Sequence, residues 1–389
     1  MASGSTEARA TAAQEESRRA GSEPRLVELI RAEIEEHGRI TFARFMERAL
    51  TEPGLGYYAT SATRPTPTGD FVTAPELHTF FGRCVARQLS EVWARLGEPP
   101  TFTVREYGAG RGTLAATVSS GLEADGSGLL DTLDWQGLDL DGRGGRPSDG
   151  GFTGAVVANE FLDALPVHRV VVRNGKLLER FVTWRDDRFA EEEGAASTPE
   201  LAAHLAADGV TLAEGQLAEV CLAAPRWVAA AAADLERGLL LVIDYGHPAA
   251  ELYGPRRMAG SLLTYRAQSV GDDPFSTVGN QDLTAHVDFT AIDRAATGAG
   301  LERLGTTTQA EFLAGLGLAQ LLSGLGNDPD TEPQAYVAAR TSVARLLDPR
   351  HLGAFGVLMY ARDLPAGPTL AGLAYRMRRP GAGGASSGL

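Results

Sequence analysis

The stretch from Phe102 to Leu114 constrains the fold of this chain more than any other. An apolar run leads into Glu106, a short glycine-rich turn follows, and an apolar pattern at helical spacing begins at Leu114. This order predicts a β-strand, a tight turn and an α-helix, because glycine lacks the Cβ that would block such a turn. A strand, turn and helix in this order are typical of nucleotide-binding α/β folds.

The turn departs from the dinucleotide-binding fingerprint. Its glycines are Gly108, Gly110 and Gly112, and Thr113 occupies the position where that fingerprint requires a further glycine. An NAD-dependent oxidoreductase is therefore disfavoured. Glu106 lies two residues before the turn, which suits a ligand without phosphate. S-adenosylmethionine (SAM) fits, because the acid can approach its amino group while the turn amides approach its carboxylate and ribose.

Two further apolar runs predict buried strands that end in polar residues. The first ends in Asn159 and Glu160, with Asp163 shortly after them, and the second ends in Asp244. Ligands of open α/β sheets bind at the carboxyl ends of the strands, so chemistry is expected at these residues. The alternative interpretation is a strand end with a solvated acid. Together the runs predict a doubly wound α/β sheet with insertions.

Composition and periodicity divide the chain into parts. Residues 1–23 and 380–389 are predicted to be disordered tails. Apolar residues at helical spacing predict an N-terminal helical region over 24–98 that contributes to the site. Residues 99–379 carry the predicted strands and form the sheet domain, with an insertion around 167–236 that opens with a hairpin at an Asn-Gly turn.

Two polar stretches outside these strands are further candidates for the site. The loop from Gly69 to Glu76 either lines a site or forms an Asp turn followed by a helix cap. The stretch 282–288 places His286 between two aspartates, and His286 is either a general base or a hydrogen-bonded core residue. A metal site is not predicted there, because no further His or Cys lies close by in the sequence.

Charge and composition limit the partners. The sequence has 36 Lys and Arg against 50 Asp and Glu, a net charge of -14 that repels nucleic acid and anionic membranes but tolerates a basic protein segment. Cys84 and Cys221 are far apart, which favours a reducing cytoplasm over a disulfide framework. The single lysine, Lys176, and the abundance of Ala, Gly and Arg indicate a bacterial genome rich in GC. No apolar run reaches the length of a membrane span, and a homodimer is compatible with the sequence.

The ordered set of motifs resembles that of the MidA family of class I SAM-dependent methyltransferases. The resemblance covers residues 26 to 316. Its motifs are, in order, Gly54–Tyr58, Gly69–Phe71 with Thr73 and Glu76, Glu106 with Gly108–Gly112, Asn159–Glu160 with Leu162–Val167, Ile243–Gly246 and Asp282–Phe289. The resemblance implies a Rossmann-like methyltransferase sheet with an N-terminal helical region and inserted elements.

The same resemblance implies an activity and a set of site residues. Mitochondrial members act in the assembly of respiratory complex I by dimethylating an arginine of one of its subunits, which implies a protein methyltransferase with arginine as the leading target. Glu160 and Asp163 are expected to orient the guanidinium by hydrogen bonds, and His286 is the third catalytic candidate. The cofactor SAM is expected to contact Gly69, Asp70, Phe71, Thr73, Glu106, Gly108, Gly110 and Asn159.

One departure from the family concerns the second strand of the sheet. Class I methyltransferases place an acid at the end of a strand that follows the glycine-rich helix, where it binds the ribose hydroxyls. The segment between Gly108 and Asn159 is short, so this strand is predicted to be shortened or lost. Asp139 and Asp141 are interpreted either as replacements for that acid or as loop acids. The alternative function is therefore a non-catalytic assembly or interaction protein with an eroded cofactor site.

Overall fold

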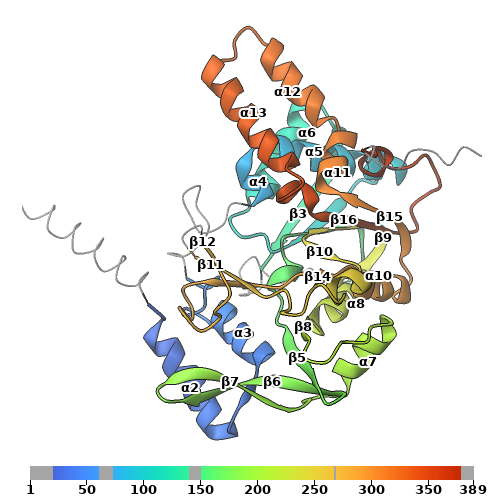
Figure 1. Ribbon diagram of the computed structural model, residues 1–389. Helices are drawn as coiled ribbons and strands as arrows, with labels where there is room; N and C mark the ends of the chain where they lie inside the picture. Colours follow the sequence, from blue (N-terminus) through green and yellow to red (C-terminus); the bar gives the residue numbers. More distant parts are fainter. Residues whose placement is uncertain (1–20, 61–72, 140–149, 267–268, 378–389) are drawn as a thin grey trace, which may run out of the picture.

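The structure, a computed structural model, describes residues 21–60, 73–139, 150–266 and 269–377. Its largest sheet has six strands in the order β15-β16-β9-β4-β2-β3 (Figure 1). In that order the strands are Glu302–Thr308, Gly356–Arg362, Leu235–Asp244, Phe152–Asn159, Phe102–Tyr107 and Leu133–Leu138. The four strands from β9 to β3 are parallel, whereas β16 pairs antiparallel with β9.

Helices cover both faces of this sheet. Along β9, Leu239 and Leu241 contribute to one hydrophobic core, and Leu240 and Val242 contribute to a second core on the opposite face. The helices of the first core include α5 (Thr79–Arg95) and α6 (Thr113–Ala124), and those of the second include α8 (Ala223–Asp234) and α10 (Phe289–Gly298). A strand covered on both faces has to be apolar along its length. The predicted doubly wound α/β sheet is therefore confirmed.

The second strand, which was predicted to be shortened or lost, is present, and that prediction is wrong. It is β3, which pairs in parallel with β2 over six residues from Leu133 to Leu138. Its sequence, Leu-Asp-Trp-Gln-Gly-Leu, tolerates two polar residues because β3 lies at the edge of the sheet and most of its side chains are only partly buried. Asp139 follows its carboxyl end directly, while Asp141 lies outside the described residues.

The insertion forms a second sheet together with part of the N-terminal region. The predicted hairpin is confirmed, since β5 (His168–Arg173) and β6 (Lys176–Arg185) pair antiparallel around Asn174 and Gly175. The neighbours of this pair are β1 (Ile40–Thr41), β7 (Arg188–Ala195) and β8 (Leu217–Val220). Strand β1 precedes α3 (Phe42–Thr51), and it pairs with β6. The helices α2 (Pro24–His37) and α3 consequently share a hydrophobic core with the insertion.

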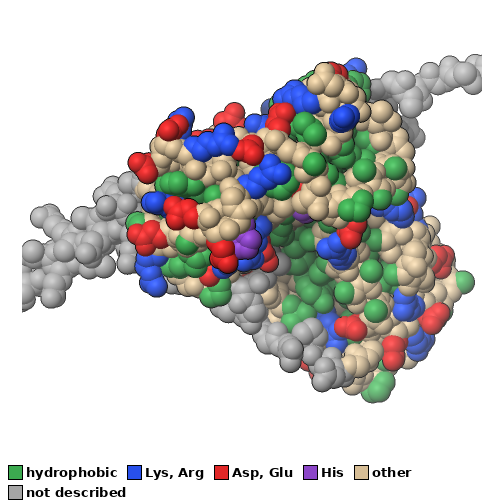
Figure 2. Space-filling view, turned by 90° about the horizontal axis from the view of Figure 1, so that it is seen from below, with side chains coloured by type: hydrophobic (Ala, Val, Ile, Leu, Met, Phe, Trp, Pro, Cys, Tyr) green, Lys and Arg blue, Asp and Glu red, His purple; other side chains and the backbone are tan. Residues whose placement is uncertain are grey.

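Short strands and further helices complete the fold. A three-stranded sheet in the order β12-β11-β13 consists of Ser269–Gly271, Leu263–Arg266 and Asp282–Thr284. A helical group, α11 (Gln309–Gly315), α12 (Leu318–Asn327) and α13 (Pro333–Leu347), lies at the top of Figure 1 on the side of α5 and α6. Within the described ranges, every helix is too short or too polar to cross a membrane. On the face shown in Figure 2, the described arginines are interspersed with acids rather than gathered into one broad basic patch.

Candidate functional site

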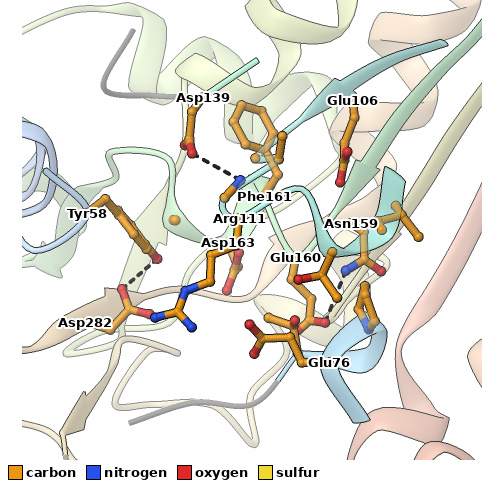
Figure 3. A pocket seen from close by; sticks show the side chains of 18 of the residues that line it. Tyr58, Glu76, Glu106, Arg111, Asp139, Asn159, Glu160, Phe161, Asp163 and Asp282 are labelled. Atoms are coloured by element: carbon orange, nitrogen blue, oxygen red, sulfur yellow. Dashed lines mark hydrogen bonds between the residues drawn. The ribbon is translucent and has the colours of Figure 1, made fainter. Parts of the chain in front are cut away.

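A cavity that opens to solvent, with about 1080 Å³ of empty space including its open mouth, lies where β2, β3 and β4 end (Figure 3). The N-terminal region contributes Tyr58 and Thr73 to its wall, and the small sheet contributes Tyr265 and Thr284. Among the described lining residues the only basic side chain is Arg111. The acidic lining residues are Glu76, Glu106, Asp139, Glu160, Asp163 and Asp282. This excess of carboxylates suits ligands that carry positive charge.

The glycine-rich turn after β2 forms one wall of the cavity. Gly108, Gly110 and Gly112 have φ angles of 74°, 53° and 73°, in the left-handed region that glycine adopts without strain. A Cβ at Gly108 would lie 3.1 Å from the ring of Phe161. The sequence led us to expect turn amides that approach the ligand, but two of them are already used. The amides of Gly108 and Ala109 both donate to the carbonyl of Leu138. The glycines therefore shape the turn, and acidic side chains supply its polar groups.

Glu106 ends the buried part of β2 and is 4% exposed. Its Oε2 accepts a hydrogen bond of 2.8 Å from the indole Nε1 of Trp135, on the neighbouring strand β3. Burial raises the pKa of Glu106 to about 7; the Trp135 hydrogen bond opposes this rise, and the charge of Asp139 adds to it. A cationic group bound next to Glu106 would stabilise its carboxylate form.

Asp139 lies across the turn from Glu106 and lines the cavity. Its Oδ2 accepts a hydrogen bond of 3.1 Å from the amide of Gly110. The end of β3 thus supplies an acid at the place where class I methyltransferases are expected to bind ribose. Glu106, Asp139 and the turn together fit SAM, which presents an ammonium group and ribose hydroxyls.

Glu160 follows β4 with a φ of 51°, which is strained for a residue other than glycine. The strained backbone is held by its neighbours: the amide of Glu160 donates to the carbonyl of Ile243, and Asp244 Oδ2 accepts from the amides of Phe161 and Leu162 at 3.2 and 2.8 Å. Asp244 lies at the end of its strand, as predicted, but it is completely buried. It holds the loop after Glu160 in place and does not line the cavity.

The side chain of Glu160 points into the cavity (Figure 3). Its Oε1 accepts hydrogen bonds from the amide of Ala74 at 3.0 Å and from Asn159 Nδ2 at 3.2 Å. Burial raises the pKa of Glu160 to about 8, and the charges of Asp163 and Glu76 contribute to the same rise. The amide of Ala74 and the side chain of Asn159 oppose it.

Six polar atoms in the wall of this cavity are buried and lack a hydrogen-bond partner in the described part of the chain. Two are the hydroxyls of Tyr245 and Thr284, and the four carboxylate or amide oxygens are Glu76 Oε2, Asn159 Oδ1, Glu160 Oε2 and Asp163 Oδ1. Buried acceptors in native proteins are normally satisfied, so four in one cavity indicate a ligand rich in N–H donors. Burial also raises the pKa of Asp163 to about 6, against the opposing effect of the Tyr245 hydroxyl.

Asp282 and Tyr58 form the side of the cavity opposite Glu160. The hydroxyl of Tyr58 donates a hydrogen bond of 2.8 Å to Asp282 Oδ1. Figure 3 shows the side chain of Arg111 extending toward Asp282. The sequence motifs contained Tyr58 and Asp282 without assigning them a role, and Arg111 was not predicted. Their signal was only the polar character of their loops.

The structure brings most of the predicted site residues together. Thr73, Glu106, Gly108, Gly110, Asn159, Glu160 and Asp163 all line the cavity. Gly69, Asp70 and Phe71 lie outside the described residues. Glu76 and Asp139 also line the cavity. Asp139 is therefore not a loop acid away from the site, which was one of its two interpretations.

His286 does not line this cavity, contrary to its expected place in the site. Its ring packs edge to face against Tyr245, with 5.3 Å between ring centroids, and Tyr245 separates it from the cavity. Burial lowers the pKa of His286 to about 4, and the nearby Arg257 and His247 add to this effect. Nδ1 of His286 is buried without a hydrogen-bond partner among the described residues, so the side chain is not the hydrogen-bonded core residue of the alternative interpretation either.

Comparisons with known proteins agree with this geometry. A family model for S-adenosyl-L-methionine-dependent methyltransferases matches residues 127–307. A crystal structure from Burkholderia thailandensis with S-adenosyl-homocysteine bound is 34% identical, covers 90% of this chain and 95% of its own, and superposes with a TM-score of 0.80.

Two mitochondrial proteins are more distant relatives. The protein arginine methyltransferase NDUFAF7 homolog of Drosophila melanogaster is 29% identical over 84% of this chain and 82% of its own length. The human protein arginine methyltransferase NDUFAF7 is 26% identical over 82% and 79%. With a relative at 34% identity along nearly its whole length, and with a cavity that fits the cofactor, this chain belongs to the MidA family of methyltransferases that use SAM.

Proposed function

We propose that this methyltransferase modifies an arginine side chain in a basic segment of a protein. The observation that carries the proposal is the set of four unpaired acceptors in the cavity wall, on Glu76, Asn159, Glu160 and Asp163. A guanidinium has five N–H donors in a planar fork and keeps its charge at every physiological pH. It can therefore satisfy several of these acceptors at once.

Separate parts of the cavity would hold the cofactor and the substrate. On the side of the glycine-rich turn, Glu106 would receive the amino group of SAM and Asp139 its ribose hydroxyls. Arg111, the one basic side chain among the described lining residues, is the candidate partner for the carboxylate of SAM. When bound, SAM supplies a methyl group made electrophilic by its sulfonium centre.

Glu160 and Asp163 would bind and orient the guanidinium. Asp163 would hold two of its nitrogens by parallel hydrogen bonds, which favours charge on them and leaves the third nitrogen, next to Glu160, available as the nucleophile. A bound guanidinium would also lower the raised pKa of Glu160, because an opposite charge stabilises the carboxylate. The alignment and the exclusion of water would supply most of the rate enhancement.

The methylated nitrogen has to lose one proton during the reaction. We infer that Glu160 accepts it. The charge of the bound guanidinium lowers the raised pKa of Glu160, so its carboxylate is ionised when the substrate is present and can take the proton from the nitrogen that it contacts.

The two mitochondrial relatives support arginine as the target, since the Drosophila and human proteins are both named protein arginine methyltransferases. The alternative of a non-catalytic interaction protein loses its support, because it depended on the loss of a strand that β3 supplies.

The test is methyl transfer from radiolabelled SAM to a pair of peptides that differ only in carrying arginine or lysine. We expect transfer to the arginine peptide alone. Glu160→Gln should abolish transfer while SAM still binds in calorimetry, and Glu193→Gln, at a surface ion pair on β7, serves as the matched control. Transfer to the lysine peptide, or full activity of Glu160→Gln, would refute the proposed substrate or the proposed role.

A further inference from the structure

A second cluster of polar side chains lies outside the cavity, where the insertion meets the start of α10. It consists of His204 on α7 (Glu200–Ala207), Asp208 at the end of that helix, and Asp288 of β14 (Val287–Asp288). His204 Nε2 lies 3.3 Å from Asp208 Oδ2 and 3.5 Å from Asp288 Oδ2. The side chains of His204, Asp208 and Asp288 are 5%, 0% and 7% exposed.

The three facing atoms have no hydrogen-bond partner among the described residues. The other carboxylate oxygens of the cluster are already used. Asp208 Oδ1 accepts a hydrogen bond from Arg294 at 2.5 Å, and Asp288 Oδ1 accepts from the amides of Thr290 and Ala291 at the start of α10. These bonds fix the two carboxylates so that their remaining oxygens point toward the imidazole.

We propose that His204, Asp208 and Asp288 bind a divalent transition metal, Zn²⁺ or Mn²⁺. All three atoms lie within 4.8 Å of one another. Ligands about 2.1 Å from a tetrahedral zinc ion lie ~3.4 Å apart, close to the two distances from His204 Nε2. An imidazole with two carboxylates suits zinc or manganese, whereas magnesium and calcium prefer oxygen ligands alone.

The surroundings of the cluster resemble the outer shell of a metal site. Ligating carboxylates are commonly oriented by hydrogen bonds from neighbouring groups, and Arg294 and the amides at the start of α10 supply such bonds here. Arg294 already pairs with Asp208 Oδ1, and a metal at the facing oxygens would offset the burial of both carboxylates. The competing description is a polar cluster of the same three side chains that holds no metal.

The metal would be structural, because none of its three ligands lines the cavity. Asp288 is the last residue of the segment 282–288, in which Asp282 and Thr284 do line the cavity. A metal at this point would fasten the insertion helix α7 to that segment and to α10. It would hold one wall of the cavity in place without contacting substrate or cofactor.

The test uses the full chain after treatment with a chelator and dialysis. We expect calorimetry to show one Zn²⁺ or Mn²⁺ bound per chain. Either metal should raise the melting temperature, whereas Mg²⁺ and Ca²⁺ should not. The pulsed EPR spectrum of bound Mn²⁺ should show nitrogen modulation from the imidazole.

Asp208→Asn should weaken metal binding about 100-fold, because the loss of a direct ligand should cost at least as much as the loss of a group that only orients a ligand. The Oδ1 of the asparagine can still accept from Arg294. Glu251→Gln, in a separate His–Glu pair at the surface, is the matched control and should bind metal like the wild type. Absence of stoichiometric binding, absence of the nitrogen signal, or equal affinity in Asp208→Asn and wild type would overturn the proposal in favour of a cluster that holds no metal.

Discussion

Trp135 and Glu106 face each other across two neighbouring strands, and the indole Nε1 donates a 2.8 Å hydrogen bond to Glu106 Oε2. Trp135 belongs to β3, and Glu106 belongs to β2, one residue before that strand ends. The edge strand thus contributes to the cofactor side of the cavity twice, through Trp135 beneath Glu106 and through Asp139 at its own end.

Trp135→Phe should weaken SAM binding near neutral pH. The indole hydrogen bond favours the charged form of Glu106, so its loss should raise the pKa of that carboxyl further above about 7. A neutral Glu106 cannot pair with the amino group of SAM. In wild type the affinity should therefore rise from pH 6 to pH 7.5, and in Trp135→Phe this rise should shift to higher pH. Calorimetry across that pH range measures the SAM affinity of both proteins. Glu106→Gln should remove the pH dependence of the affinity. A Trp135→Phe profile that overlays that of the wild type would contradict the prediction.

Asp139→Asn should reduce SAM affinity by about tenfold, or roughly 1.4 kcal/mol. The amide oxygen can still accept from Gly110, so the turn should persist while the charged acceptor for ribose is lost. Asp131→Asn, at an exposed position in the short helix before β3, is the control and should bind SAM normally. Unchanged affinity in Asp139→Asn would mean that the ribose is bound elsewhere.

Without ligands, the protein should lose stability as the pH rises. Glu160, Glu106 and Asp163 have pKa values of about 8, 7 and 6 in the folded state, all above their ordinary values. The folded state then holds protons that the unfolded state has released, so the stability contributed by these three carboxyls declines from about pH 4.5, near the unfolded carboxyl pKa, to about pH 8. The lowered pKa of His286 acts in the opposite direction below about pH 6.5, so the net loss of stability is expected above that pH.

Glu160→Gln isolates the share of one group in this decline. The melting temperature of the variant should fall less than that of the wild type between pH 6 and 8, because the glutamine has no proton to lose. Parallel melting curves for the two proteins across this range would argue against a raised pKa at Glu160.

Asp244→Asn should destabilise the fold and disturb Glu160 together. Asp244 is completely buried, and its two oxygens accept amide hydrogen bonds from Tyr245 on one side and Phe161 and Leu162 on the other. An asparagine would turn an N–H donor toward amide donors and cost about 1–3 kcal/mol of unfolding free energy. Urea unfolding measures the loss; a variant as stable as wild type would show that the carboxylate does not hold this loop.

Local patterns were sufficient for the elements that are regular and buried. The strand and turn around Gly108, the strand that ends in Asn159, and the hairpin at Asn174 were all predicted and are present. Strand β3 was missed because an edge strand with partly exposed side chains lacks the continuous apolar run of a central one.

The places of single side chains were harder to predict. His286 lies between Asp282 and Asp288 in sequence, but the chain passes from β13 to β14 there, so its ring packs behind Tyr245 instead of entering the cavity. The cluster of His204 with Asp288 had no local signal, because the two residues meet only through tertiary packing. Arg111 lies inside the glycine-rich turn, but nothing in the local sequence indicates that its side chain lines the cavity.

The pairing of β1 with β6 has a consequence for synthesis of the chain. Ile40 pairs with Val182, about 140 residues later, so the N-terminal segment leaves the ribosome long before its strand partner exists. At about 5–20 residues per second this interval lasts ~7–28 s. During that time the apolar sides of α2 and α3 have no partner from the insertion to cover them. The nascent chain is consequently most exposed to aggregation at its N-terminal end, before β6 is made.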